Sequence, residues 1–259
     1  MELANKKALV TGASQGIGKA IALKLGSMGC TVGIHYHSNE AKANDVKHEI
    51  SKAEGNAMIF KADMRDHEQV LKLAEDSWKA LNGIDILINN SGVSDKTDFL
   101  DTTQADFDHY NLVNYKSVFF LTQAIARKMV FSKNQGAIYT ITSVNGIRPG
   151  YGFSAYGSSK GAVETLMKGV ALELANYNIR VNTIAAGAIQ TDINASVWQD
   201  PVLLNHVNNG IPMNRLGQPD EVAALIAALL TSDSYLTGAS ISLDGGLLLM
   251  RGYGKLEGN

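Results

Sequence analysis

Residues 11–18 read Thr-Gly-Ala-Ser-Gln-Gly-Ile-Gly, and this stretch decides the fold. The apolar run Ala8–Val10 before it is typical of a buried strand, and Ile17, Ile21 and Leu25 after it recur at helical spacing. Glycines at such a turn let the backbone approach a ligand, and the helix N-terminus offers free N–H groups to a pyrophosphate. The spacing G-x-x-x-G-x-G differs from the common G-x-G-x-x-G, so the motif alone leaves a ligand-free turn open. Its position after the first strand favours binding.

Strand and helix patterns alternate along the rest of the chain. Short apolar runs predict strands at Ala8–Val10, Thr31–His35, Ala57–Lys61, Ile84–Ile88, Gly136–Thr142, Ile179–Ile184 and Ala239–Leu243. Helical periodicity predicts helices over 16–28, 40–53, 67–81, 104–131, 155–177 and 219–231. This alternation predicts a single α/β domain over 1–259, with a mainly parallel, doubly wound sheet of seven strands and helices on both faces. Ligands of such sheets bind at the carboxyl ends of the strands.

The composition excludes several classes of protein. Hydrophobic residues make up 45% and charged residues 19% of the chain, which argues for a sizeable core and against disorder. The net charge of −2, from 23 basic and 25 acidic residues, argues against a nucleic-acid binder. The apolar run Ala223–Leu230, which Val222 extends by one residue, is too short to cross a bilayer. With one cysteine and no signal-like N-terminus, the expected location is the cytoplasm.

The residues after the second predicted strand bear on the choice of nucleotide. NAD-binding sites of this kind tend to place an acid there, which binds the ribose 2′-hydroxyl. No Asp or Glu occupies 35–39, and His37, Ser38 and Asn39 can donate hydrogen bonds to a 2′-phosphate. Since an acid would repel that phosphate, we predict NADP(H) as the preferred cofactor. Gln15 is neutral and neither loop shows an Arg or Lys, so NAD(H) stays open as the alternative.

Two histidines, His35 and His37, share one face of the second predicted strand and raise the question of a metal site. No third ligand stands at a recognisable spacing, so packed or solvated histidines are the better interpretation. We therefore predict no metal.

Tyr156 and Lys160 are a candidate acid–base pair. They stand four residues apart at the start of a predicted helix, which places both on one face. A free tyrosine has a pKa of roughly 10, and a neighbouring ammonium lowers it by stabilising the phenolate. Such a pair is often a plain surface contact, but here Ser143 ends a strand 13 residues earlier. This setting favours general acid–base catalysis.

Together these motifs resemble those of the short-chain dehydrogenase/reductase family, from about residue 6 to residue 247. Asp63-Met64 resembles the family's adenine-binding pair. Residues 89–92 resemble its Asn-Asn-Ala-Gly strand end and 186–191 its Pro-Gly…Thr segment, with Ser91 in place of alanine and Ala186 in place of proline. The resemblance implies a Rossmann-type fold and cofactor contacts from Gly12, Ser14, Gln15, Gly16, Ile17, Gly18, Tyr36, His37, Ser38, Asp63, Met64, Asn90, Ser91, Gly92, Tyr156, Lys160, Gly187, Ile189 and Thr191.

The resemblance also implies an NAD(P)(H)-dependent oxidoreductase with four catalytic residues, Asn114, Ser143, Tyr156 and Lys160. In this family Tyr156 would exchange a proton with the substrate oxygen, which Ser143 holds. Lys160 would lower the pKa of Tyr156 and contact the nicotinamide ribose, and Asn114 would hold a water that links Lys160 to solvent. Further implied contacts are the adenine amino group for Asp63, the adenine ribose for Asn90, and the nicotinamide carboxamide for Ile189 and Thr191. Since Tyr and Lys are both present, an enzyme is favoured over a nucleotide-binding scaffold without turnover.

The substrate is less well defined than the reaction. Segments 187–194, 211–213 and 217–219 are similar to those of bacterial glucose 1-dehydrogenases, so we expect a secondary alcohol, such as a sugar, and its carbonyl. The 3-oxoacyl carrier-protein reductases share most of the motifs and are the alternative. Residues 145–154 and 194–209 are expected to be rim loops, with a substrate lid near 188–215 that turns at Asp200-Pro201. Predicted substrate contacts are Ser143, Asn145, Tyr151 and Tyr156. For Asn145, Arg148, Tyr151 and Trp198, substrate contact and ordinary loop surface fit equally well.

Two apolar segments predict self-association. The helix predicted from Tyr156 to Tyr177 is rich in apolar residues, namely Ala162, Val163, Leu166, Val170, Leu172 and Leu174. Residues 247–250 read Leu-Leu-Leu-Met. A monomer seldom leaves such surface bare, so we predict a homotetramer, which is common in the family; the alternative is packing inside one subunit. Apart from a small-molecule substrate, no nucleic-acid or membrane partner is expected.

Overall fold

The computed structural model describes residues 3–231 and 235–250. Within these residues, seven strands form one sheet in the order β3-β2-β1-β4-β5-β6-β7, and every neighbouring pair is parallel. The strands are β1 (Lys7–Val10), β2 (Thr31–Tyr36), β3 (Asn56–Lys61), β4 (Ile86–Asn89), β5 (Gly136–Ser143), β6 (Ile179–Ala186) and β7 (Ser240–Leu243). The predicted doubly wound α/β fold is confirmed, and the strand order reverses between β1 and β4.

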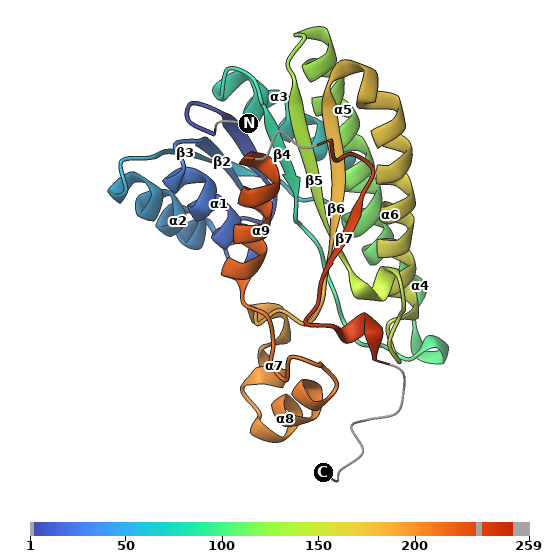
Figure 1. Ribbon diagram of the computed structural model, residues 1–259. Coiled ribbons are helices and arrows are strands. Elements are labelled where there is room, and N and C mark those ends of the chain that lie inside the picture. The colour runs from blue at the N-terminus through green and yellow to red at the C-terminus, as the bar shows by residue number, and fades with distance from the viewer. Residues whose placement is uncertain (1–2, 232–234, 251–259) are drawn as a thin grey trace.

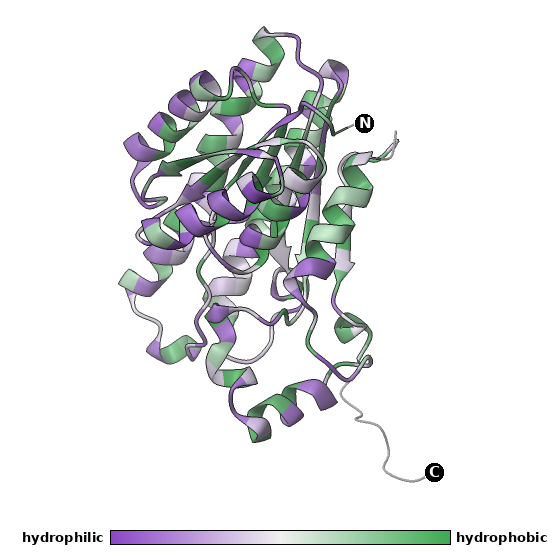
Figure 2. Ribbon diagram, turned by 90° about the vertical axis from the view of Figure 1, so that its left-hand side faces the viewer, coloured by the Kyte–Doolittle hydropathy of each residue, from purple (hydrophilic) through white to green (hydrophobic). Residues whose placement is uncertain are grey.

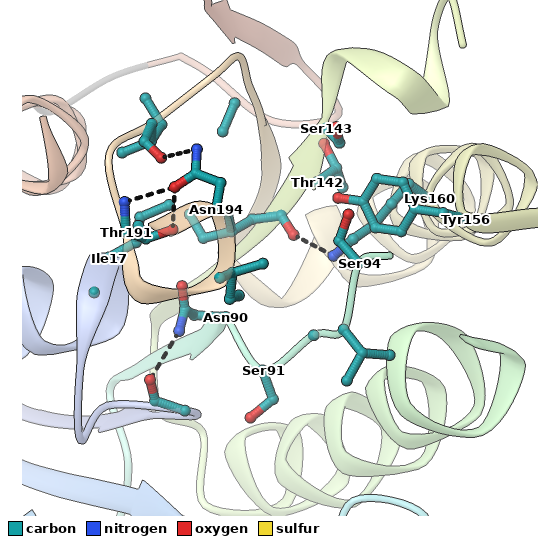
Figure 3. Close-up of a pocket in the computed structure, with 18 of the residues that line it drawn as sticks. Ile17, Asn90, Ser91, Ser94, Thr142, Ser143, Tyr156, Lys160, Thr191 and Asn194 are labelled. Carbon is teal, nitrogen blue, oxygen red and sulfur yellow. Dashed lines mark hydrogen bonds between the residues drawn. The ribbon is translucent and has the colours of Figure 1, made fainter. Parts of the chain in front are cut away.

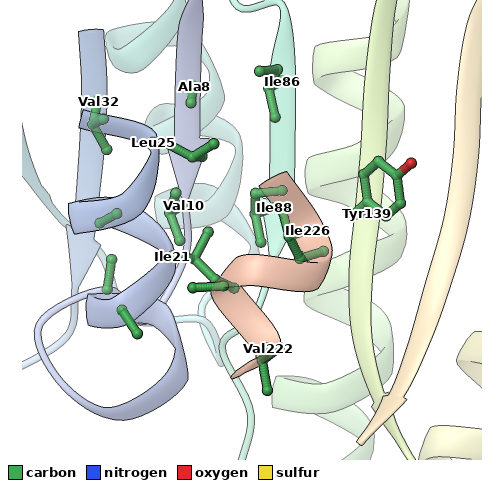
Figure 4. Close-up of a cluster of buried hydrophobic side chains, with 14 of the residues drawn as sticks. Ala8, Val10, Ile21, Leu25, Val32, Ile86, Ile88, Tyr139, Val222 and Ile226 are labelled. Atoms are coloured by element: carbon green, nitrogen blue, oxygen red, sulfur yellow. The ribbon is translucent and has the colours of Figure 1, made fainter. Parts of the chain in front are cut away.

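Helices cover both faces of the sheet (Figure 1). One face carries α1 (Gly16–Ser27), α2 (Glu40–Lys52) and α9 (Pro219–Thr231), and the other carries α3 (His67–Ala80), α5 (Ser117–Phe131) and α6 (Ser154–Leu174). On the first face, Ile21 and Leu25 of α1 meet Val222 and Ile226 of α9 above the strands (Figure 4). Figure 2 shows hydrophobic strands inside and hydrophilic outer surfaces on the helices. The core therefore consists of two layers that hold the carboxyl ends of the strands in place.

The helix predicted over 104–131 is interrupted in the structure. It consists of α4 (Gln104–Tyr110), a π-helical turn (Asn111–Lys116) and α5. Val113 and Asn114 of that turn are buried. Single π-helical turns are frequent at functional sites, because they shift the side chains that follow them around the helix axis.

The rim at the carboxyl edge of the sheet differs from the expected loops. Residues 194–209 are mostly helical, with a 3₁₀ turn (Asp192–Asn194), α7 (Ala195–Trp198) and α8 (Pro201–Asn209). Asp200 is the N-cap of α8 and accepts from the N–H groups of Val202 at 2.8 Å and Leu203 at 3.2 Å. Asp200-Pro201 is therefore a helix start, with proline at the position where its missing N–H costs nothing. Residues 144–146 form another 3₁₀ turn, and α6 begins at Ser154.

The apolar surface expected on the sixth helix is mostly covered within the chain. Val163 is buried, and Leu166, Val170 and Leu174 pack against the core of that face. Leu172, in contrast, is 82% exposed. The premise that α6 carries more apolar surface than its sheet face covers is therefore wrong for most of these residues. None of the helices among residues 3–231 and 235–250 is both long and apolar enough to cross a membrane.

Candidate active site

The turn between β1 and α1 is fixed by hydrogen bonds from a neighbouring strand end. Thr11 Oγ1 accepts from the N–H groups of Asn90 and Ser91, both at 2.9 Å, and Asn90 Nδ2 donates to Thr11 O at 2.8 Å. Gly12 has a φ of +60°, which favours glycine. An ideal Cβ at Gly18 would lie 2.3 Å from Gly12 O, so only glycine allows helix and turn to pack this closely.

His35 holds the same turn from β2. Its Nδ1 accepts from Gly12 N at 3.1 Å, and its Nε2 lies 3.1 Å from Ala62 O. These partners require a neutral ring with the proton on Nε2. Burial lowers the pKa of His35 to about 4, which favours the same neutral form. The histidine that the sequence indicated to be packed is thus a bridge between three segments.

His37 does not converge with His35. It is exposed, and its Nε2 lies 3.5 Å from the carboxylate of Asp63. No group of three or more His, Cys, Asp or Glu side chains that could hold a metal occurs in the described part of the chain.

The residues of the turn fit a dinucleotide phosphate. Gln15 is the N-cap of α1 but makes no side-chain cap bond, so the N–H groups of the first turn lack a side-chain partner there. Gly16 has a φ of +55° and keeps the turn free of a side chain. Helix N-termini of this kind bind phosphate groups through their N–H groups and dipole.

Two cations that the sequence interpretation missed lie beside Gln15 and Asp63. Lys42 Nζ is 2.9 Å from Gln15 Oε1 and 2.9 Å from Asp192 Oδ2. Arg65 donates from Nε and Nη2 to the carboxylate of Asp63, at 2.6 Å for the shorter bond. This pairing lowers the pKa of Asp63 to about 2. The two loops considered in the sequence carry no Arg or Lys, but Lys42 of α2 and Arg65, which follows β3, reach this site from outside those loops.

One cavity of about 970 Å³ runs from this end to the candidate catalytic residues. It is lined by most of the predicted cofactor residues, namely Gly12, Ser14, Gln15, Gly16, Ile17, His37, Ser38, Asp63, Met64, Asn90, Ser91, Gly92, Tyr156, Lys160, Gly187, Ile189 and Thr191. Ser143, Asn145 and Arg148 line it as well. The topology thus brings together residues from the ends of β1, β2, β4, β5 and β6.

Tyr156, Ser143 and Lys160 lie on one side of the cavity (Figure 3). Burial raises the pKa of Tyr156, and interactions with the hydroxyls of Ser143 and Ser94 lower it in part. Lys160 Nζ donates to Ile141 O at 3.1 Å. Burial lowers the pKa of Lys160 to about 8, and the charge of Glu164 acts in the opposite direction. The cluster is therefore desolvated, and Ser94 is a member that the sequence interpretation missed.

Asn114 lies beside this cluster but does not line the cavity. Its Oδ1 accepts from Val93 N at 2.9 Å, and its Nδ2 donates to Val93 O at 3.0 Å and to Ser159 Oγ at 3.1 Å. An ideal Cβ at Gly92 would lie 3.2 Å from both Asn114 Oδ1 and Lys160 Nζ. The two groups therefore face one small space that the glycine leaves open.

Four other predicted residues lie away from the cavity. Gly18 serves packing, as described above. Tyr36 is 4% exposed and packs in the core beside α2. Tyr151 is 79% exposed and donates to Asp98 Oδ2 at 2.9 Å. Trp198 donates from Nε1 to Thr191 O at 2.8 Å, so it supports a lining residue without lining the cavity itself.

The outer wall of the cavity is largely apolar and includes Pro149, Phe153, Ile193, Val207, Leu247 and Leu248. Arg148 fixes part of this wall, because it donates to Leu247 O at 2.8 Å and to Met250 O at 2.9 Å. Leu247 and Leu248, which were expected at a subunit interface, line the cavity, while Leu249 is 82% exposed.

The two departures from the family motif are accommodated. Ala186 ends β6, where it is in register with Ser143 of β5 and Leu243 of β7. Ser91 lines the cavity, and its Oγ lies 3.4 Å from His35 Nδ1. Both positions are therefore held by the sheet and the turn.

Comparisons with known proteins agree with this geometry. A family model described as enoyl-(acyl carrier protein) reductase matches residues 12–248. Glucose 1-dehydrogenase of Gluconobacter oxydans is 37% identical over 258 residues, which cover 99% of this chain and 96% of that protein. The structure of acetoin dehydrogenase from Enterobacter cloacae is 36% identical with a TM-score of 0.89, over 97% of this chain and 98% of that one.

A short-chain dehydrogenase/reductase from Serratia marcescens is 32% identical with a TM-score of 0.90, over 95% of this chain and 99% of that one. These proteins match this chain over nearly its full length, and the match agrees with the motifs found in the sequence. The chain belongs to the short-chain dehydrogenase/reductase family and is an NAD(P)-dependent oxidoreductase that interconverts a secondary alcohol and a carbonyl.

Proposed function

We propose that this protein is an NADP(H)-dependent dehydrogenase of a sugar-like secondary alcohol, with Tyr156 as the general acid–base. The observation that carries this proposal is the single cavity that joins the glycine turn to Ser143, Tyr156 and Lys160. When bound, the nicotinamide supplies the hydride chemistry. Tyr156 takes the hydroxyl proton during oxidation and returns it during reduction. Ser143 holds the reacting oxygen beside the Tyr156 hydroxyl.

Lys160 stabilises the phenolate of Tyr156 and reaches the nicotinamide ribose. Asn114 supports the proton path, because it shares with Lys160 the small space at Gly92 that suits a water. At the other end, Asp63 and Met64 face the adenine, Asn90 the adenosine ribose, and Ile189 and Thr191 the nicotinamide carboxamide. Residues 188–215 act as a lid whose short helices border the same cavity.

The preference for NADP(H) is supported by the charges at the adenosine end. No acid occupies 35–39, while Lys42 and Arg65 lie next to the lining residues Gln15 and Asp63. Replacing Lys42 by Ala should weaken NADP⁺ binding about tenfold and leave NAD⁺ binding nearly unchanged, from the typical strength of a charge-assisted bond to phosphate. Lys52→Ala, on the exposed end of the same helix, is the control. Equal losses for the two cofactors, or tighter binding of NAD⁺ by the wild type, would contradict this preference.

The sugar-like substrate is supported by the 37% identity to a glucose 1-dehydrogenase. The second candidate is a 3-oxoacyl thioester of a carrier protein, because the apolar wall of Phe153, Val207 and Leu248 suits an acyl chain. The test follows reduced-nicotinamide absorbance with NADP⁺ and D-glucose, with NADPH and acetoin, and with NADPH and a 3-oxoacyl thioester. We expect turnover with the sugar. Turnover with the thioester alone would favour the second candidate.

We further propose a homotetramer in the cytoplasm. The exposed apolar side chains that remain on the described surface include Phe131, Leu172 and Tyr177, at 91%, 82% and 51% exposure. Large exposed apolar groups favour burial against other copies. The single cysteine is buried, and burial raises its pKa to about 11, so it suits a reducing compartment where no disulfide is needed. Light scattering of the dilute enzyme checks the assembly; an active monomer would contradict it.

A further inference from the structure

A buried carboxylate, Glu164, lies on α6 one helical turn beyond Lys160. It is only 6% exposed, and it faces the sheet rather than solvent. Thr142 of β5 donates its hydroxyl to Oε1, and Thr183 of β6 donates to Oε2 at 2.7 Å. Both carboxylate oxygens are thus hydrogen-bonded by neutral donors from two adjacent strands.

Neutral donors stabilise a carboxylate but leave its negative charge in place. A buried charge is costly unless a counter-charge lies near it. Residues four apart share one face of a helix, and two cations stand at that spacing from Glu164: Lys168, which is exposed, and Lys160, which is only 6% exposed. The opposite charges of Glu164 and Lys160 therefore occupy consecutive turns of α6 in the same desolvated layer between helix and sheet.

Lys160 has a particular need for such a charge. Its Nζ donates to Ile141 O at 3.1 Å, and a carbonyl supplies no full negative charge. Burial disfavours its ammonium form, and Glu164 opposes that effect by raising the pKa of the lysine. The other titratable groups near these two residues are Tyr156 on α6 and Tyr110 of α4, whose rings are 6.2 Å apart, and the exposed Lys168 on the next turn of α6. The two tyrosines are neutral in their protonated form, and Lys168 is a cation, so none of the three supplies a negative charge. Glu164 is thus the formal anion that faces Lys160 from this layer.

We propose that Glu164 is a positioning residue, which keeps Lys160 in its ammonium form and aligned with Tyr156. The side chain of Glu164 does not line the cavity, whereas that of Lys160 does, so Glu164 would act through Lys160 and not on substrate or cofactor directly. Its two threonine partners fix the carboxylate between β5 and β6, and the helix fixes its spacing from Lys160. This inference rests on the proposed roles of Tyr156 and Lys160.

The direct test reads the titration of Lys160 in the full-length protein. Lysine labelled with ¹³C at Cε is incorporated, the Lys160 signal is assigned by its loss in Lys160→Met, and the signal is followed from about pH 6 to pH 11, on both sides of the lysine midpoint. In Glu164→Gln, which keeps the shape and one hydrogen-bond acceptor, we expect the midpoint of Lys160 to fall by at least about one pH unit, as for loss of a charge one helical turn away. Glu173→Gln, the same change at an exposed site of α6, should leave it unchanged.

The kinetic readout is the pH profile of carbonyl reduction. Reduction needs a protonated Tyr156 beside an ammonium Lys160, so the alkaline limb should move to lower pH in Glu164→Gln by a similar amount. If Glu164 served packing alone, Glu164→Gln would lower the rate by the same factor at every pH and leave the alkaline limb at its wild-type pH. Glu164→Asp retains the charge and should keep the alkaline limb at its wild-type pH. If the Gln variant does not fold, the pH profile of Glu164→Asp is measured instead.

The outcomes separate this inference from the proposed function. An unmoved Lys160 midpoint and an unmoved limb in Glu164→Gln overturn the inference, even when Tyr156→Phe is inactive. An active Tyr156→Phe variant overturns the proposed function instead, while the titration of Lys160 still decides whether Glu164 stabilises its charge.

Discussion

The glycine turn and the substrate rim lie at the same edge of the sheet but are held together differently. The bonds of the turn join residues that are far apart in sequence, such as Asn90 to Thr11 and Gly12 to His35. Around α7 and α8 the bonds of the rim are local, such as Thr191 N to Asn194 Oδ1 at 2.9 Å, and neither helix contains a buried residue. The turn is therefore part of the global fold, whereas the rim can change with little effect on it.

This difference explains how one family accommodates different substrates. The relatives include a glucose 1-dehydrogenase, which matches over the length of this chain, and acetoin dehydrogenases, which share its fold. An ion pair between Lys42 of α2 and Asp192, at 2.9 Å, joins the surroundings of the glycine turn to the start of the rim. Substitutions in the turn should therefore affect stability and cofactor binding together, and substitutions in the rim mainly substrate binding.

The largest expected effect is at Tyr156, which lines the cavity and is the proposed general acid–base. Tyr156→Phe removes the proposed proton donor but keeps the ring, whose neighbours are Tyr110 and Phe153. Turnover should fall by about 10²–10⁴-fold, the typical contribution of acid–base catalysis. Cofactor affinity, measured by fluorescence titration, should stay within about twofold. Near-wild-type turnover would contradict the assignment.

The second effect is acid destabilisation through His35. Its pKa in the folded chain is about 4, against 6.5 for a free histidine, because burial favours the neutral ring. The corresponding stability is fully present above pH 6.5 and is lost as the pH falls through about 4. A difference of about 2.5 pH units corresponds to about 3 kcal/mol in the free energy of unfolding.

Urea unfolding at several pH values measures this loss. Between about pH 7 and pH 4, the wild type should lose about 3 kcal/mol more than His35→Asn, which cannot titrate. His37→Asn is the matched control, because His37 is exposed, and it should follow the wild type. If the free energy of unfolding falls equally with pH in the wild type and in His35→Asn, protonation of His35 is not the cause of the acid destabilisation.

The third effect tests the packing of the turn. In Gly18→Ala the new methyl group would lie 2.3 Å from Gly12 O and 2.5 Å from Asn90 Nδ2, and a backbone oxygen cannot rotate away. We expect a loss of about 1–3 kcal/mol in stability together with weaker cofactor binding. Gly169→Ala in α6 is the control, since nothing lies within 4 Å of its new methyl group, and its Tm should hold or rise. An unchanged Tm and an unchanged cofactor affinity in Gly18→Ala would show that the packing of the turn contributes to neither stability nor cofactor binding.

Much of the fold follows from local patterns in the sequence. Each predicted strand overlaps an observed one, because buried parallel strands are short apolar runs. Periodicity failed at 111–116, since a π-helical turn adds one residue without breaking the apolar pattern. It failed again at 201–209, where α8 buries no residue and so carries little periodic signal. The proline after Asp200 was a helix-start signal that favoured this helix.

The candidate site was predictable where it lies on contiguous motifs. Ser143, Tyr156 and the glycine turn are of this kind, and all line the cavity. Lys42 and Arg65 were not predictable, because only the folded chain brings α2 and the end of β3 beside the turn. Glu164 carried one usable signal, its position four residues after Lys160, but burial is needed to distinguish it from a surface helix pair.

The smallest expected effect concerns the rim, the second of the two regions at the carboxyl edge of the sheet. Trp198→Phe keeps the aromatic ring but removes the Nε1 bond to Thr191 O. Thr191 lines the cavity, so its loss of support should raise KM, whereas the chemical step depends on Tyr156 and should keep its kcat. One hydrogen bond is worth about 1 kcal/mol, which corresponds to about a fivefold change in KM. Because the bond is local and α7 contains no buried residue, Tm should change by only about 1–2 °C.

Tyr151→Phe, which removes a bond to Asp98 outside the cavity, is the matched control and should leave KM unchanged. A Trp198→Phe variant with a large loss in Tm would show that the rim is as much a part of the global fold as the turn.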